Sequence, residues 1–377
     1  MLRKTLQTIF AIALLQLGNS ALAFTLITIP PEQVSPSNAI TDSTTLDTQV
    51  QSIALAIRTH LFSARHARNS NKTAQYGGVL AANSHVDSVS DLDGLTLAYN
   101  DLAAAGGGSV AEGGSGNASK GLWITSAYSS LKNDFSRTRF DGDTHNLLAG
   151  FDITLADKYI LGVAVSHELS RFDTKFNIGN EKTTGFNISP YIAVLLSDAW
   201  SIDVGLGHGK FKTSQSRAVA DPLFVPIPVV VDSEFSSTRD FVSTNLTNVS
   251  AWGNLKLTSS VGYIAAKQKQ DGYVESNGNA VSDSSRTSKQ WNLAGEAAYS
   301  HGDSESFVGV IYEKNRNPAK IEFTTGEQPP NDPDSFLLNV GWRYFGKGLA
   351  ANFMFSSRLG QEKVTEYGFS TVIRSEF

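Results

Sequence analysis

The chain has 377 residues, a formal net charge of −5 and no cysteine. This charge gives no overall attraction to nucleic acid, which calls for a basic face. The absence of cysteine excludes disulfide scaffolds, cysteine-ligated zinc or iron–sulfur sites and thiol nucleophiles. With 21 Phe, 11 Tyr and 5 Trp, the chain holds too many large apolar side chains to be disordered throughout.

Residues 1–23 have the pattern of a secretory signal peptide. Two basic residues precede an apolar run over residues 6–17, and Ala21-Leu22-Ala23 supplies the small residues that signal peptidase recognises. We therefore expect cleavage between Ala23 and Phe24. The apolar run is too short for a membrane span, which needs about 20 residues. An uncleaved N-terminal anchor is the alternative interpretation.

From residue 120 onward, apolar residues alternate with small or polar ones, as in Trp200, Ile202 and Val204. A period of two places one face of a strand in an apolar medium and the other face against water or polar side chains. The pattern predicts twelve strands, over residues 121–130, 142–154, 158–169, 183–196, 199–211, 238–251, 254–267, 286–300, 304–314, 335–345, 348–357 and 365–377. Their connections alternate between tight turns of Asp, Asn or Gly and long polar loops.

Long strands joined by alternating short and long connections are typical of a transmembrane up-and-down β-barrel. The barrel has to close, because an open sheet edge in hydrocarbon leaves backbone groups unpaired. A soluble β-sandwich or propeller also alternates, but the signal peptide and the aromatic residues near strand ends favour a membrane barrel. We expect an all-β, antiparallel, monomeric barrel, surrounded by lipid in the outer membrane of a Gram-negative bacterium and exposed at the cell surface.

Charged residues inside the predicted strands fall on the face opposite the apolar one. A Lys or Arg that faces lipid at the bilayer midplane costs about 2–4 kcal/mol, so these side chains are expected to face the lumen. The set comprises Asp152, Glu168, Asp203, Lys256, Glu296, Arg343, Arg374 and Glu376. We expect a mixed-charge network that rigidifies the barrel wall. The alternative is that some of these charges hold a segment inserted into the pore.

The end of the chain carries a further signal. The sequence stops at Phe377, and Ile373 and Phe369 share one face of the predicted last strand. A terminal aromatic residue on an amphipathic strand resembles the signal by which outer-membrane proteins engage the barrel assembly machinery. Ser375 departs from that pattern, because a hydrophobic residue is commoner at its position. We expect Phe377, Ile373 and Phe369 to act as the barrel-assembly signal.

Residues 121–377 resemble the autotransporter β-domain, the C-terminal translocator of type V secretion. The resemblance rests on the order and spacing of Gly121-Leu122-Trp123, Asp141-Gly142-Asp143, Leu147-Leu148-Ala149-Gly150-Phe151-Asp152, Leu161-Gly162-Val163-Ala164-Val165-Ser166, Ser189-Pro190-Tyr191, Ser197-Asp198-Ala199-Trp200 and Gly368-Phe369-Ser370. It implies a twelve-stranded barrel, which agrees with the strands predicted from alternation. It also implies a passenger ahead of the barrel.

Residues 24–105 are expected to form this short passenger or a plug, because they are too few for the long β-helix of many autotransporters. Apolar residues from Leu46 to Leu61 recur at helical spacing. A second, weaker helix is predicted over residues 86–105, and a glycine-rich linker over residues 106–120 leads into the barrel. In the resembled family a pore helix lies just ahead of the first strand. We therefore expect any pore helix to come from residues 86–105.

The sequence holds no Gly-x-Ser-x-Gly, His-Glu-x-x-His or Walker motif, so we expect no enzyme, catalytic residue, metal site or cofactor. The run Gly205-Leu206-Gly207-His208-Gly209 lies inside a predicted strand and is interpreted as small residues facing a crowded lumen. His60 and His66 are too far apart on the first helix to share one face. The histidines in general are expected to be solvated or interfacial.

Two functions remain open from the sequence. The first is an autotransporter-type barrel that anchors its short N-terminal segment and translocates it to the cell surface. The second is a surface adhesin or structural barrel that contacts host or surface ligands through its extracellular loops, with the N-terminal segment as a plug. The apolar, proline-rich run over residues 222–231 is expected to extend the strands above the membrane or fold into the mouth. A host contact is the alternative for that run.

Overall fold

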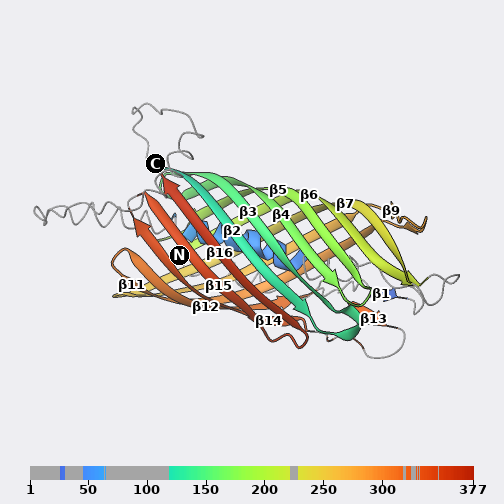
Figure 1. Ribbon diagram of the computed structural model, residues 1–377. Coiled ribbons are helices and arrows are strands. Elements are labelled where there is room, and N and C mark those ends of the chain that lie inside the picture. Colours follow the sequence, from blue (N-terminus) through green and yellow to red (C-terminus); the bar gives the residue numbers. More distant parts are fainter. Residues whose placement is uncertain are drawn as a thin grey trace, which may run out of the picture.

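The computed structural model describes residues 26–29, 46–62, 64, 119–220, 228–316, 320–323, 328, 330, 332–346 and 348–377. Within these residues, twelve antiparallel strands form one closed barrel (Figure 1). The strands are β2 (Ser119–Asn133), β3 (Phe140–Leu155), β4 (Tyr159–Thr174), β5 (Gly179–Leu195), β6 (Trp200–Ala220), β7 (Pro228–Trp252), β8 (Leu255–Gln270), β11 (Ser284–His301), β12 (Ser304–Asn315), β14 (Asp334–Gly346), β15 (Leu349–Leu359) and β16 (Val364–Glu376). Each strand pairs with the next along the chain, and β16 pairs with β2 to close the ring. The predicted fold class is confirmed.

Every predicted strand has a counterpart, and the main difference is length. β6 and β7 contain 21 and 25 residues and reach well beyond the predicted ranges 199–211 and 238–251. Their extra residues mix polar side chains with apolar ones such as Val230, Val231 and Phe235. The alternation that marks a membrane strand is lost there, although backbone pairing continues. Of the apolar run 222–231, residues 228–231 belong to β7, and residues 221–227 lie outside the described residues.

The two faces of the barrel have opposite chemistry. In β4, Leu161, Val163 and Val165 are exposed on the outer face, whereas Ser166 and Glu168 are buried on the inner face. An apolar outer face is what a barrel wall in lipid requires. None of the described helical residues belongs to a helix that is long and apolar enough to cross a membrane.

Tight turns lie at one end of the barrel. Ala156 and Asp157 between β3 and β4 both have positive φ, 49° and 52°, as a two-residue hairpin of type I′ requires. Gly253 and Gly302 occupy similar left-handed positions in two further turns, where a residue without Cβ is favoured. The chain enters β2 and leaves β16 at this same end (Figure 1). We call it the short-turn end and the opposite end the long-loop end.

A two-stranded hairpin folds over the rim at the long-loop end. It consists of β9 (Tyr273–Val274) and β10 (Ala280–Val281) in the β8–β11 connection. Arg217 of β6 donates two hydrogen bonds of 3.0 Å to the carboxylate of Glu275, and both side chains are buried. Tyr273 stacks on Phe235 with ring centroids 4.7 Å apart, and burial raises the pKa of its hydroxyl to about 12. The hairpin is therefore fixed to the inner face of the β6–β7 extension.

Three shorter segments complete the long-loop end. β1 (Leu26–Ile29) pairs in parallel with β13 (Lys320–Phe323), which lies in the β12–β14 connection (Figure 1). A single 3₁₀ turn, η1 (Ser136–Thr138), lies in the β2–β3 connection. The parallel pair places a segment from the start of the chain beside a loop of the barrel.

Candidate functional site in the barrel lumen

Residues 46–62 and 64 are helical and lie inside the barrel (Figure 1). We call this segment the lumen helix. The helix predicted from Leu46 to Leu61 is therefore present, but its position corrects our expectation. We assigned any pore helix to residues 86–105, which lie outside the described residues. The assignment relied on closeness to the first strand, whereas the helix inside the barrel comes from residues earlier in the chain, farther from that strand.

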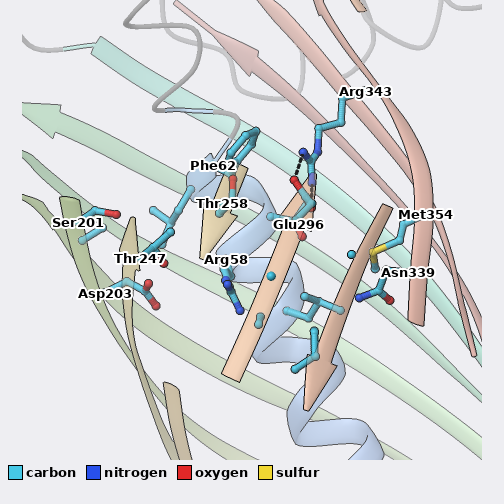
Figure 2. Close-up of a pocket in the computed structure, with 18 of the residues that line it drawn as sticks. Arg58, Phe62, Ser201, Asp203, Thr247, Thr258, Glu296, Asn339, Arg343 and Met354 are labelled. Atoms are coloured by element: carbon cyan, nitrogen blue, oxygen red, sulfur yellow. Dashed lines mark hydrogen bonds and ion pairs between the residues drawn. The ribbon is translucent and has the colours of Figure 1, made fainter. Parts of the chain in front are cut away.

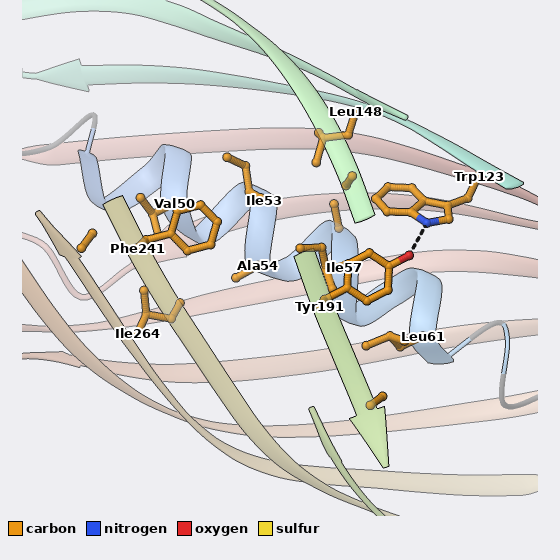
Figure 3. Close-up of a cluster of buried hydrophobic side chains, with 14 of the residues drawn as sticks. Val50, Ile53, Ala54, Ile57, Leu61, Trp123, Leu148, Tyr191, Phe241 and Ile264 are labelled. Carbon is orange, nitrogen blue, oxygen red and sulfur yellow. Dashed lines mark hydrogen bonds between the residues drawn. The ribbon is translucent and has the colours of Figure 1, made fainter. Parts of the chain in front are cut away.

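The apolar stripe of the lumen helix packs against one side of the barrel wall. Val50, Ile53 and Ile57 are almost fully buried, with 1–2% of their surface exposed. The wall residues that meet this stripe are Trp123, Leu148, Ile160, Ala164, Tyr191, Ala193, Phe241, Ile264 and Ala266 (Figure 3). Each fully buried aliphatic side chain of this size contributes about 1.5–3 kcal/mol relative to exposure. The lumen therefore contains the hydrophobic core of the protein.

The other faces of the helix meet polar wall residues and a smaller apolar group. Leu55 packs against Phe307 and Met354. Arg58 hydrogen-bonds to the hydroxyl of Ser260 in β8. Because apolar and polar positions of the helix match different strands of the wall, only one rotation of the helix about its axis satisfies all these contacts.

The helix runs from the long-loop end to the short-turn end. Asp47 accepts a hydrogen bond of 2.7 Å from Asn315, the last residue of β12 at the long-loop end. His60 instead contacts Asp152 of β3, three residues before the tight turn, and Arg374 of β16 near its short-turn end. The first residues of the helix therefore lie towards the long-loop end and its last residues towards the short-turn end.

At the short-turn end, His60 is enclosed by four wall residues, and we call the five together the inner clamp. They are His60, Trp123, Asp152, Tyr191 and Arg374, each with at most 5% of its surface exposed. The His60 ring stacks on Trp123 with centroids 4.7 Å apart and an interplanar angle of 13°. Its Nε2 lies 3.1 Å from the Tyr191 hydroxyl and 3.2 Å from Asp152 Oδ2.

The wall residues of the inner clamp also bind one another. Arg374 donates from Nη1 and Nη2 to the two oxygens of Asp152, at 2.7 and 3.1 Å. Trp123 Nε1 donates to the Tyr191 hydroxyl at 2.8 Å (Figure 3). A buried charge is tolerated where it is paired and hydrogen-bonded, and the bidentate Arg–carboxylate contact meets that condition. His60 thus lies in a pocket whose polar wall residues also bind one another.

Three glycines make room for the inner clamp. A Cβ on Gly150 would lie 2.3 Å from the Trp123 ring, and a Cβ on Gly162 would lie 2.2 Å from the Tyr191 ring. A Cβ on Gly121 would lie 2.1 Å from the Arg374 guanidinium. Gly150 and Gly162 are the cross-strand partners of Trp123 and Tyr191. Gly121 lies two residues before Trp123, the partner of Arg374, and the large side chain lies across the glycine in each case. Several short pieces that carry the family resemblance therefore converge at this clamp.

At the long-loop end, the helix meets a polar group that we call the outer clamp. It consists of Asp47, Thr48 and Gln51 of the helix with Glu313, Asn315, Arg358 and Glu366 of the wall. Arg358 bridges Glu313 and Glu366, and it also donates to Gln51 Oε1 at 2.8 Å. Thr48 donates to Glu366 at 3.4 Å.

A cavity of about 90 Å³ remains beside the C-terminal half of the lumen helix (Figure 2). Arg343 of β14 donates two hydrogen bonds of 2.6 Å to Glu296 of β11, and its guanidinium lies 4.4 Å from the Phe62 ring centroid. Arg58 and Asp203 line the same cavity. Of the predicted charges, Glu296 and Arg343 thus meet each other and the helix.

The remaining predicted charges form contacts within the wall. Glu168 pairs with Arg239 at 2.7 Å, Asp203 accepts from Asn245 at 2.9 Å, and Lys256 pairs with Glu305. Glu376 is half-buried at the end of β16. Some of the predicted charges therefore pair within the wall, and others contact the lumen helix.

His60 is the residue that the sequence reasoning missed. We expected solvated or interfacial histidines, and this ring is fully buried. His145 and His208 do lie on the outer face, whereas His66 lies outside the described residues. Its place in the sequence could have indicated burial, because His60 lies next to Leu61 and three residues after Ile57, on the apolar stripe of the helix. Within the described chain, no group of three or more His, Asp or Glu residues is arranged to hold a metal ion.

The predicted assembly signal lies on the last strand. Phe369 and Phe377 are exposed on the outer face, and Ile373 is half-buried. The backbone of Phe377 exchanges two hydrogen bonds with Lys120, at 2.9 and 3.0 Å, which completes the seam between β16 and β2. The predicted cleavage position, between Ala23 and Phe24, lies outside the described residues.

A twelve-stranded membrane barrel whose lumen is filled by a helix from its own N-terminal region defines the class of protein. The sequence matches the autotransporter beta-domain family over residues 122–343, so the chain belongs to that family. Members of the family are outer-membrane secretion domains of Gram-negative bacteria. A comparison with curated proteins gives no match.

Two solved structures share the fold. One is the translocator domain of the autotransporter NalP from Neisseria meningitidis, with 13% identity, a TM-score of 0.55, and coverage of 75% of this chain and 98% of that one. The other is the beta domain of the Bordetella autotransporter BrkA, with 13% identity, a TM-score of 0.54, and coverage of 68% and 98%. At this identity the similarity is one of fold.

Proposed function

We propose that this barrel carries the chain segment ahead of the lumen helix to the cell surface, anchors it there, and is closed by the helix. The direction of the helix carries the proposal. Its residues Asp47 and Gln51 contact the long-loop end, and His60 contacts the short-turn end. Long loops face outward and short turns face the periplasm in barrels of this kind. Residues before the helix therefore emerge on the outer side.

The position of β1 supports this reading. Leu26–Ile29 pairs with β13 in a connection at the long-loop end, on the side from which the helix enters the lumen. On this proposal the predicted passenger or plug of residues 24–105 divides into parts. Residues before 46 are displayed, and the lumen helix is the plug.

Three epitope-tagged proteins test the proposal in intact cells treated with external protease. A tag after Pro36, ahead of the lumen helix, is expected to be cleaved. A matched tag between Ala156 and Asp157, in a short turn, is expected to be protected until the cells are lysed. A third tag after Gln361, in a long-loop connection, is expected to be cleaved and reports barrel orientation. Protection of the Pro36 tag while the Gln361 tag is cleaved would reject surface display.

We also propose that Phe377, Ile373 and Phe369 are recognised by the barrel assembly machinery. Their position on the outer face of the closing strand makes them available before the seam to β2 forms. Deleting Phe377 is expected to lower the amount of folded barrel in the outer membrane. A Ser375→Ala variant is the control, because it leaves all three side chains in place. Equal amounts of the fast-migrating unboiled form in both variants would contradict the proposal.

A second candidate function is favoured by the β6–β7 extension. The β9–β10 hairpin is fixed to that extension by the buried Arg217–Glu275 pair, which gives an ordered surface at the long-loop end. We propose it as a contact surface for host or surface ligands. Replacing residues 276–279 with a Gly-Ser segment of equal length is expected to reduce binding of whole cells to host surfaces. Unchanged binding, with the barrel present at its normal level, would reject the contact surface and leave surface display as the remaining proposal.

A further inference from the structure

Five basic side chains gather on the outer face of the barrel near the long-loop end. We call them the basic rim patch: Arg171 of β4, Lys182 of β5, Lys210 of β6, and Lys267 and Lys269 of β8. All five are exposed. These strands are consecutive in the barrel apart from β7, which lies between β6 and β8 (Figure 1).

The patch lies at one level, directly above the apolar band of the wall. Along the outer face of β6, Leu206 is followed by His208 and then Lys210. Along β8, Tyr263 and Ala265 lead to Lys267 on the same face. Basic residues at the edge of an apolar, aromatic band occupy the membrane–water interface, where lipid headgroups lie.

The charges in the patch are crowded together. Arg171 and Lys182 are direct cross-strand partners. Lys210 and Lys269 both pair with Thr238 of β7, from opposite sides. Like charges placed directly opposite one another in a sheet are destabilising unless an anion offsets the repulsion. The arrangement therefore calls for a negatively charged group at this level.

Described acidic side chains on this face contact other residues. Asp143 and Asp240 are the direct cross-strand partners of Arg171 and Lys267, but their carboxylates contact His145 at 3.4 Å and His208 at 2.7 Å. Glu234 pairs with Lys212, Asp240 with His208 at 2.7 Å, and Asp173 with Lys175 at 3.5 Å. None of the five patch residues lies within 4.0 Å of a described carboxylate oxygen.

Three other basic residues at the long-loop end, one of them next to the patch, each have a carboxylate partner. Lys132 pairs with Asp134 at 3.0 Å, Lys175 with Asp141 at 3.3 Å, and Lys314 with Asp334 at 3.5 Å. The five patch residues differ from these three in having no described carboxylate oxygen within 4.0 Å.

We propose that the basic rim patch binds the phosphate groups of phosphorylated glycolipids in the outer leaflet of the outer membrane. Ammonium and guanidinium groups form charge-assisted hydrogen bonds with phosphate oxygens, and the adjoining apolar wall accommodates the acyl chains. The leaflet assignment rests on the proposed function, which places the long-loop end outside. The lipid contact itself is independent of translocation.

The test uses the full chain folded in a neutral detergent, with diphosphoryl lipid A as the probe and native mass spectrometry as the readout. A patch variant carries Arg171→Gln, Lys182→Gln, Lys210→Gln and Lys269→Gln. The matched control carries Lys132→Gln, Lys175→Gln, Lys314→Gln and Lys363→Gln, which remove four basic residues that already have acidic partners. We expect at least ~10-fold weaker lipid binding by the patch variant, and a change of less than about 2-fold in the control.

Equal lipid binding by the patch variant and the control would overturn the proposal. Equal binding of fully dephosphorylated lipid A to the unmodified protein would overturn it too, because phosphate is the recognised group. Displacement of the lipid by inorganic phosphate at equal concentration would reassign the patch to free anions. Heat-modifiable migration of each variant on gels confirms that the barrel is folded. The protease test of the Pro36 tag needs no patch substitution, so the two proposals fail separately.

Discussion

At the short-turn end the lumen helix presents one side chain, His60, to a sealed pocket of aromatic rings and a buried ion pair. At the long-loop end it presents three polar side chains to a charged group centred on Arg358. Shape and exclusion of water dominate the inner clamp, whereas the outer clamp relies on exchangeable hydrogen bonds. We infer that the inner clamp fixes the position of the helix along the pore. The outer clamp lets the preceding part of the chain pass out towards the cell surface.

The largest expected effect comes from removing the helix from both clamps. Ile53→Asp with Ile57→Asp places two carboxylates against the apolar wall, where each lost aliphatic contact costs about 2–5 kcal/mol before the added charge is counted. We expect the helix to leave the lumen while the barrel stays closed, and single-channel conductance in planar bilayers to rise severalfold over that of the unmodified protein.

Ser52→Asp is the control for that experiment, because its half-buried side chain lies outside the apolar stripe and is expected to leave conductance low. The pairing of Glu296 with Arg343 beside Phe62 gives a second check. Glu296→Ala and Arg343→Ala are each expected to raise conductance modestly. Unchanged conductance in both variants and in the double Asp variant would exclude the helix as the closure of the pore.

The second effect concerns the ion pair of the inner clamp. Arg374→Ala leaves the Asp152 carboxylate buried without its partner, and breaking such a pair costs about 3–5 kcal/mol. The urea midpoint for loss of the folded, fast-migrating form is expected to fall. The double variant Asp152→Asn with Arg374→Gln removes both charges and is expected to recover part of the loss. A midpoint for Arg374→Ala equal to that of the exposed-pair variant Lys132→Ala would contradict the assigned role.

The third effect tests how tightly the inner clamp is packed. Gly162→Ala would place a methyl group 2.2 Å from the Tyr191 ring, so the ring has to leave its position against Gly162, which disturbs its contact with His60. Such overpacking costs about 1–3 kcal/mol. Gly295→Ala is the matched control, because its added Cβ meets no atom within 4 Å. We expect a lower urea midpoint for Gly162→Ala and an unchanged one for Gly295→Ala. Equal midpoints for the two variants would show that the Tyr191 ring can move without a loss of stability.

The fold was largely predictable from the sequence, because a membrane wall imposes strict alternation on every strand. The apolar stripe from Leu46 to Leu61 likewise predicted a helix. The position of this helix was not predictable, because an apolar stripe does not specify the surface against which it packs. In addition, residues 65–118 separate the helix from β2. The inner clamp was missed for the same reason: His60 meets Asp152 and Arg374 only after the barrel has closed around the helix.

The smallest expected effect lies in the outer clamp. Gln51→Ala removes hydrogen bonds to Glu313 and Arg358, while the two wall residues keep their ion pair. The net contribution of such bonds is about 0.5–1.5 kcal/mol. We expect a small fall in the urea midpoint with no rise in single-channel conductance, because the inner clamp still holds the helix. Arg358→Ala provides the contrast, since it leaves Glu313 and Glu366 buried side by side without their shared cation. If Gln51→Ala opened the pore as widely as Ile53→Asp with Ile57→Asp, the outer clamp and not the inner one would hold the helix in place.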